Sequence, residues 1–213
     1  MNRDSNSPEG SVPKLRDRIR EVTQDTILNA SEEVFAEEGL HASKMETIAA
    51  RAGVSVGTLY NYFTDKGTLF AALVESRHRS LIAIVDAALE GAKGKPFRER
   101  LLAMSRAFFS HFDVYRRYFV ILIQAEHRKL ENGVLKSAPG NTMHELYLRV
   151  SELIESGIKE GSLRADMSEH LPVFLLGAFR GVLIRDVLYN QGFGDFEMRS
   201  QRLVKFFLEG AEA

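Results

Sequence analysis

The residues with the most specific chemistry lie close together in the segment 44–63, KMETIAARAGVSVGTLYNYF. Tyr60, Asn61 and Tyr62 follow one another there, at positions that a packed helical core does not require. Hydroxyl and amide groups exposed on a short helix are suited to hydrogen bonds with phosphate oxygens and base edges. We therefore expect this segment to contact a nucleic acid.

Two short helices must hold these side chains, and the spacing around them predicts a helix-turn-helix. Ala49 is small where two helices must cross closely, and Gly53, four residues later, permits the left-handed backbone of the turn. Ser43 is predicted to cap the first helix and Ser55 the second. Their shared core is expected to consist of Ile48, Ala52, Val54, Leu59 and Phe63.

The second helix of such a motif places its N-terminal half in the major groove of DNA. Its exposed positions are predicted to be Val56, Gly57, Thr58, Tyr60, Asn61 and Tyr62. A corner of two helices without a binding role would explain the glycine and the apolar residues. It would leave two exposed tyrosines and an asparagine unexplained.

The composition of the whole chain restricts its function. Its 213 residues, 45% of them apolar, can bury a sizeable core in one or two domains. The net charge of -1 argues against a general polyanion binder, so DNA binding must depend on local placement. The chain has no cysteine, hence no disulfide and no thiolate metal site, and the cytoplasm is the expected compartment. No apolar run approaches the roughly 18 residues that a membrane span needs.

The sequence also argues against an enzyme. It contains no glycine-rich phosphate loop before a helix, no nucleophile elbow and no cluster of catalytic acids. Its six histidines form neither an HxxxH nor an HExxH pattern. We therefore expect no catalytic residue, no metal and no cofactor.

Apolar residues recur at spacings of three and four nearly throughout, which predicts an all-α fold of about nine helices. The first helix is expected at about 15–38, with an apolar stripe that includes Ile19, Val22, Ile27, Ala30 and Val34. Thr64 or Asp65 is expected to cap a long helix toward Glu90, and five more helices are expected at about 97–112, 115–130, 142–160, 168–190 and 196–210. The predicted parts are a disordered leader, 1–13, a helix-turn-helix domain, 14–67, and a helical effector-binding and dimerisation domain, 68–213.

Charges are segregated along the first helix. Basic residues from Lys14 to Arg20 crowd its start, and acidic residues crowd its end, namely Glu32, Glu33, Glu37 and Glu38. Either the basic end meets phosphate while the acidic end turns away, or the charges are an ordinary solvated face.

The run ILNASEEVFAEEGLHASKMETIAARAGVSVGTLYNYFTDKGTLFAAL resembles the N-terminal signature of the TetR family of bacterial transcriptional regulators. The resemblance covers about residues 20–70. It implies a three-helix DNA-binding domain joined through a long fourth helix to a divergent helical domain that dimerises and binds an effector. The chain departs from the family pattern at Val56, where a basic residue is frequent, and at Gly67, where glutamate is common.

Carried over by residue, the resemblance implies that Ser43 and Lys66 meet phosphate and that Tyr60 and Tyr62 lie against the sugar-phosphate backbone. The candidates for base edges are Val56, Gly57, Thr58 and Asn61. The predicted DNA-contacting residues are Ser43, Lys44, Ser55, Val56, Gly57, Thr58, Tyr60, Asn61, Tyr62 and Lys66. The alternatives are that the two tyrosines pack on the domain core, that Ser43 only caps and that Lys66 is only solvated.

Small and apolar residues near the C-terminus predict helix pairing. Gly177, Ala178 and Gly181 would let another helix approach closely, and the last helix offers Leu203, Phe206 and Phe207. The resemblance implies that these two helices pair with their symmetry mates in a homodimer. A core within one chain is the alternative.

An effector pocket is expected among the middle helices, because ligand sites are apolar cavities with a few polar groups. Its candidate residues are Phe108, Phe112, Tyr115, Tyr118, Phe119, Gln124, His127, His144, Tyr147 and Arg180. The expected protein is a homodimeric repressor that binds a palindromic operator in double-stranded DNA and is released by a small, largely apolar molecule, with no membrane partner. The alternative is a DNA-bound interaction protein of the same fold, similar to nucleoid-occlusion factors, without a ligand.

Overall fold

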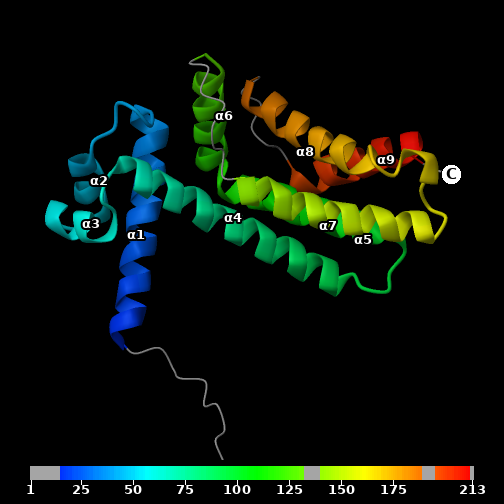
Figure 1. Ribbon diagram of the computed structural model, residues 1–213, viewed down its shortest axis with the longest axis horizontal. Coiled ribbons are helices and arrows are strands. Elements are labelled where there is room, and N and C mark those ends of the chain that lie inside the picture. Colours follow the sequence, from blue (N-terminus) through cyan, green and yellow to red (C-terminus); the bar gives the residue numbers. More distant parts are fainter. Residues whose placement is uncertain (1–14, 132–139, 189–194, 212–213) are drawn as a thin grey trace, which may run out of the picture.

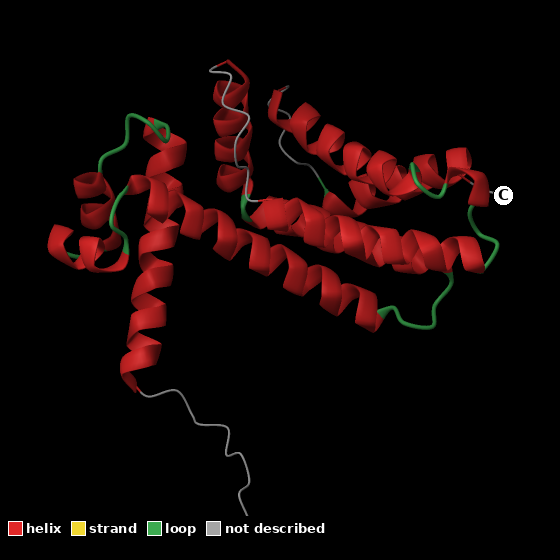
Figure 2. Ribbon diagram, viewed as in Figure 1, coloured by secondary structure: helices red, strands yellow, loops and turns green. Residues whose placement is uncertain are grey.

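The computed structural model describes residues 15–131, 140–188 and 195–211, and over these ranges all of its regular secondary structure is helical (Figures 1 and 2). The prediction of an all-α fold is therefore confirmed, whereas the predicted leader lies outside the described residues. The helices are α1 (Leu15–Glu38), α2 (Met45–Ala52), α3 (Val56–Tyr62), α4 (Lys66–Gly91), α5 (Phe97–Val114), α6 (Arg116–Glu131), α7 (Gly140–Lys159), α8 (Leu171–Leu188) and α9 (Phe196–Ala211), with a short 3-10 helix at Ala165–Met167. Within these ranges, no helix is long and apolar enough to cross a membrane.

Helices α1, α2 and α3 pack with the start of α4 at one end of the molecule (Figure 1). Phe35, Ile48, Leu59 and Leu69 are fully buried where they meet. The turn between α2 and α3 is built as the sequence predicts, since Gly53 has a left-handed backbone with φ +68°. Its cap is also confirmed, because the Ser55 hydroxyl accepts a hydrogen bond from the Thr58 backbone N–H at 3.0 Å.

The predicted apolar stripe of α1 is only partly buried. Ile27 and Val34 belong to the core, but Ile19 and Val22 are 57% and 66% exposed. The reason is length, because the first turns of α1 extend beyond the helices that it packs on and have nothing to cover them within the described part of the chain (Figure 1). Periodicity identifies an apolar face, but it does not tell how far the partner helix reaches.

Helix α4 connects the two ends of the molecule. Asp65 caps its N-terminus by accepting a hydrogen bond from the Thr68 backbone N–H at 2.7 Å. Its far end packs on α5, which also contacts α7 and α9 (Figure 1). Helix α8 begins at Leu171 rather than at the predicted Ser168, because residues 168–170 form a turn that follows the 3-10 helix.

Candidate DNA-binding surface and ligand cavity

The outer side of α3 presents the predicted reading residues. Leu59 is fully buried and anchors the helix, whereas Val56, Gly57, Tyr60 and Asn61 are exposed. Lys44 and Ser55 are exposed beside them, and Thr58 is half-buried with its hydroxyl 2.8 Å from that of Ser55. The structure thus gathers an exposed surface of amide, hydroxyl and apolar groups on one short helix.

Tyr62 is less exposed than predicted. It lies three residues after the buried Leu59, so it shares the inner face of α3. Its ring packs against that of Phe63, with centroids 6.3 Å apart, and it is half-buried. The alternative that this tyrosine packs on the core therefore describes the structure, and Tyr60 is the exposed tyrosine of the helix.

Ser43 does not cap α2, so that prediction is wrong. The helix begins one residue later, and its N-cap position is taken by Lys44, whose side chain makes no capping bond. The Ser43 hydroxyl instead donates to the Leu40 carbonyl at 2.9 Å, and the side chain is buried. Its hydroxyl therefore closes the turn between α1 and α2 and does not face outward toward a phosphate.

Lys66 joins the start of α4 to that same turn. Its ammonium group donates to the carbonyls of His41 and Ser43, at 2.6 and 2.7 Å. The alternative of a merely solvated lysine is wrong, and two of its three N–H donors are used within the chain. Lys66 therefore positions α2 relative to α4.

Changing Tyr60 to phenylalanine is expected to weaken binding to all DNA sequences by about 2- to 10-fold, because one hydrogen bond to the backbone is lost. Asn61→Ala is expected to change which base pair is preferred. Lys44→Ala is expected to reduce the salt dependence of binding by about one phosphate contact. Fluorescence anisotropy on duplexes selected from a random pool, at several salt concentrations, measures all three.

Tyr147→Phe is the matched control for this series. It removes the same hydroxyl group from a similarly exposed tyrosine on α7 and should leave DNA binding unchanged. Equal losses in Tyr60→Phe and Tyr147→Phe would contradict the assignment of Tyr60 to the DNA surface.

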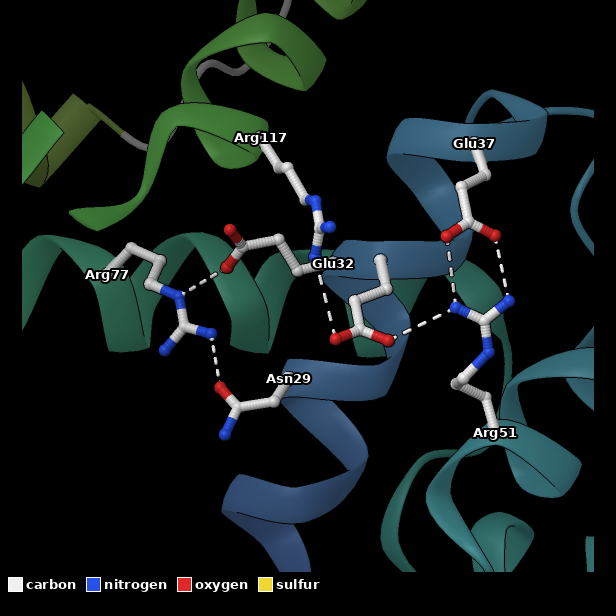
Figure 3. A network of polar contacts seen from close by, with 7 residues as sticks. Asn29, Glu32, Glu37, Arg51, Arg77 and Arg117 are labelled. Atoms are coloured by element: carbon white, nitrogen blue, oxygen red, sulfur yellow. Dashed lines mark hydrogen bonds and ion pairs between the residues drawn. The ribbon is translucent and has the colours of Figure 1, made fainter. Parts of the chain in front are cut away.

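A network of charged side chains ties α1 to α2 and α6 (Figure 3). Arg51 of α2 donates to both oxygens of Glu37, at 3.1 and 2.8 Å, and to Glu33 at 3.1 Å. The other oxygen of Glu33 lies 3.5 Å from a terminal nitrogen of Arg117 on α6. The hydrogen bond from Arg51 holds the pKa of the Glu37 carboxyl below its usual value. The acidic end of α1 is therefore an attachment point for two other helices.

One carboxylate of this acidic end is buried. Glu32 accepts from Nε of Arg77 on α4 at 2.7 Å, and Nη2 of Arg77 donates to the Asn29 side chain at 2.6 Å (Figure 3). Both charged side chains are buried, and the guanidinium lies over the ring of Tyr115, 4.4 Å from its centroid. Neither of the two readings of the charge pattern predicts this contact, because both place the acidic residues in solvent.

Arg77 also lines a cavity among α4, α5, α6, α7 and α8 that holds about 100 Å³. Most of its wall is apolar, and the nitrogen-bearing side chains are two arginines and two histidines. The lining residues are Arg77, His78, Leu81, Phe108, His111, Phe112, Tyr118, Phe119, Leu122, Ile123, Leu146, Leu176, Arg180 and Leu183.

Five of the residues predicted for an effector pocket line this cavity, namely Phe108, Phe112, Tyr118, Phe119 and Arg180. Tyr115 stands behind the wall, against Arg77 and the His111 ring. Gln124 is exposed, and His144 and Tyr147 are exposed because α7 buries the face that carries Leu146. The side chain of His127 lies outside the described residues.

Sequence reasoning missed Arg77, His78 and His111. The signal was present for the first two, because they occupy the same stripe of α4 as the buried Leu73, Val74, Leu81 and Ile82. A charged residue at a buried position of an amphipathic helix needs a partner or a function.

Burial is the main cause that lowers the pKa of His111, to about 4, and the charge of Arg77 lowers it further. Burial also lowers the pKa of His78, although the nearby Glu145 acts in the opposite direction. Both imidazoles are therefore neutral at pH 7.

The outer face of α8 and α9 is apolar and open. A β-carbon added at Gly177 or Gly181 would meet no neighbouring atom within 4 Å, and Val173 and Phe174 beside them are more than half exposed. Phe206 of α9 continues this face and is 75% exposed. We call these five residues the α8–α9 face.

The other residues predicted for the dimer interface lie elsewhere. Phe207 is only 7% exposed and Leu203 is buried with it in the core of the chain, while Ala178 is half-buried. For Leu203 and Phe207 the alternative of a core within one chain is therefore correct. Successive residues of a helix point in different directions, so Phe206 and Phe207 cannot share one face.

A three-helix bundle that exposes the second helix of a helix-turn-helix, joined to a helical domain with its own cavity, defines a DNA-binding regulator. Residues 27–73 match the family described as bacterial regulatory proteins, tetR family. Over these residues the chain is similar to the TetR family. Its members are transcriptional regulators, so the exclusion of an enzyme is confirmed.

Several proteins similar to this chain are transcriptional regulators. The chain is 22% identical over 192 residues to the transcriptional regulator UidR of Escherichia coli K12, covering 90% of each protein. It is 36% identical over 94 residues to the transcriptional activator FasR of Mycolicibacterium smegmatis, which is 44% of this chain and 42% of FasR. Among solved structures, FadR from Bacillus subtilis in complex with stearoyl-CoA has a TM-score of 0.73 at 19% identity, covering 87% of this chain and 98% of FadR. That likeness shows the fold.

Proposed function

We propose that this protein is a homodimeric transcriptional repressor that binds a palindromic operator and is released when a small, largely apolar molecule occupies the cavity. The observation that carries the proposal is Arg77, which lines the cavity and holds Glu32 of α1 in the buried ion pair. Glu33, the next residue of α1, is bonded to Arg51 of the helix-turn-helix. The cavity and α2, the first helix of the helix-turn-helix, are therefore connected through one turn of α1.

The size of the cavity supports release as the response. It holds about 100 Å³, whereas ligand pockets generally hold about 300 to 1,000 Å³. A ligand of ordinary size must therefore push the lining helices apart. Tyr118 and Phe119 line the cavity from α6, directly after Arg117, which lies within ion-pair distance of Glu33. A shift of α6 or α4 then moves the attachment of α1.

The α8–α9 face supports the homodimer. Two copies of an open apolar surface can bury each other across a two-fold axis, which matches the two-fold symmetry of a palindromic operator. The apolar cavity, with its few buried polar groups, supports a ligand-controlled regulator over an interaction protein without a ligand. The stearoyl-CoA bound to FadR of Bacillus subtilis supports an acyl compound as the first ligand to test.

Calorimetry of stearoyl-CoA with and without a saturating selected operator tests the proposal. Coupled sites weaken each other by the same factor, typically about 5- to 150-fold. We expect operator to weaken ligand binding, and ligand to weaken operator binding, equally. Ligand affinity that is identical with and without operator would refute release, and in vitro transcription from a promoter carrying the operator decides between repression and activation.

A further inference from the structure

The polar side of the cavity carries more hydrogen-bonding capacity than the chain uses. His78 and His111 are 4% and 2% exposed, and both line the cavity. Neither nitrogen of His78, nor Nε2 of His111, has a hydrogen-bond partner among the described residues. Leaving a buried polar atom unpaired is costly, so these atoms are suited to a ligand that supplies the missing partner.

The charge of the lining indicates which partner fits. Its two arginines and two histidines all carry nitrogen donors, and no acidic residue of the described ranges belongs to the lining. Glu145 lies nearby, 3.7 Å from Nε2 of His78, which is too long for a hydrogen bond, and its own side chain is 43% exposed. An oxygen acceptor is therefore favoured over an amine.

The histidines are neutral, which suits an apolar site. A neutral imidazole donates one hydrogen bond without placing a charge in the cavity. The positive charge at this corner belongs to Arg77, whose Nε and Nη2 are bonded to α1. Phe108, Phe112 and Phe119 surround the other side of the space and offer only apolar surface.

We propose that Arg77, His78 and His111 form a binding corner for the carbonyl oxygen of an acyl compound, a free carboxylate or a thioester, whose chain lies among the phenylalanines. This rests on the proposed function and specifies its ligand. Because Arg77 also holds Glu32, a head group at this corner competes for the guanidinium that joins α4 to α1. One residue, Arg77, would thereby both recognise the ligand and form the ion pair that joins α4 to α1.

The test compares ligands that share one chain and differ in the head group: decanoate, decanoyl-CoA, decanol and decylamine. The cost of widening the cavity is common to all four. Calorimetry at pH 7 is expected to give at least about tenfold tighter binding of decanoate or decanoyl-CoA than of decanol and decylamine. Tighter binding of decanoate identifies a free acid as the ligand, and tighter binding of decanoyl-CoA identifies a thioester.

Three variants locate the preference. His111→Phe should lose about tenfold in affinity for the acyl compounds and little for decanol, whereas His111→Gln, whose amide also donates, should restore the preference. Phe112→Leu is the control on the chain side and should weaken all four ligands similarly. Near-ultraviolet circular dichroism verifies the fold, and if His111→Phe does not fold, the comparison of His78→Gln with His78→Leu replaces it.

Equal binding of all four ligands, a preference for decylamine, failure of all four to bind, or an unchanged preference in both histidine series would each overturn this inference. These outcomes differ from failure of the proposed function. If the protein prefers acyl compounds through His111 but stays bound to its operator when they bind, the binding corner is supported. The proposal of ligand-triggered release is then refuted.

Discussion

Glu32→Ala is expected to lower the free energy of unfolding by about 3 to 5 kcal/mol, because it leaves the Arg77 guanidinium buried without its charged partner. Urea denaturation at one fixed protein concentration measures the loss. Glu33→Ala is the matched control, since it makes the same change one residue later on an exposed pair. Exposed pairs contribute little, so the control should cost much less. Similar losses in the two variants would contradict a special role for the buried pair.

The double variant Glu32→Leu with Arg77→Leu separates stability from control. Replacing a buried ion pair with apolar residues of similar volume is often neutral or stabilising. We therefore expect this variant to unfold near the wild-type urea concentration and to bind operator, yet to have lost the response to ligand, because Arg77 is proposed both to bind the head group and to hold Glu32. Normal release in a well-folded double variant would show that the signal passes through α6 and Arg117 instead.

If the proposed homodimer pairs through the α8–α9 face, Gly177→Trp is expected to give a monomer and to weaken operator binding by about a thousandfold or more, because half of the DNA contacts would be lost. In one chain a β-carbon at this exposed position meets no neighbouring atom within 4 Å, so the fold should be retained. Sedimentation velocity at micromolar concentration measures the oligomeric state, and anisotropy measures DNA binding.

Gly91→Trp is the control, because the same side chain is added at another open glycine, at the end of α4. It should remain a dimer. Phe206→Asp should also give a monomer, since this residue lies on the α8–α9 face, whereas the neighbouring Phe207→Asp would place a carboxylate in the core and damage the fold. A wild-type monomer, or a dimer of Gly177→Trp, would exclude this face as the interface.

The helix-turn-helix could be predicted from the sequence because its determinants are local. The left-handed Gly53 and the Ser55 cap act within a few residues of the helices that they shape. The incorrect prediction that Ser43 caps α2 shows the limit of such reasoning. The Ser43 hydroxyl could bond forward to a backbone N–H of α2 or backward to the Leu40 carbonyl, and it bonds to Leu40. Small differences in free energy between such alternative hydrogen bonds decide where a helix begins.

The cavity and its connection to α1 could not be predicted in the same way. Glu32 and Arg77 are 45 residues apart in the chain, and only the packing of α4 on α1 brings them together. Helix α8 is apolar around most of its circumference, so the sequence could not separate the half-buried Ala178 from the exposed Gly177 and Gly181. The positions of Arg77 and His78 on the apolar stripe of α4 indicate that each needs a polar partner. The sequence does not indicate which residue or ligand that partner is.

The attachment of α2 has a consequence for how such a protein can diversify. Arg51 fastens α2 to α1, and Lys66 fastens the preceding loop to α4. The exposed side chains of α3, such as Val56 and Asn61, carry none of these bonds among the described residues. The residues predicted to read DNA and the residues that hold the helices together are therefore different. Under the proposed function, a change of DNA sequence preference on α3 would leave these bonds in place, so one scaffold could acquire new target genes while it keeps its response to the same molecule.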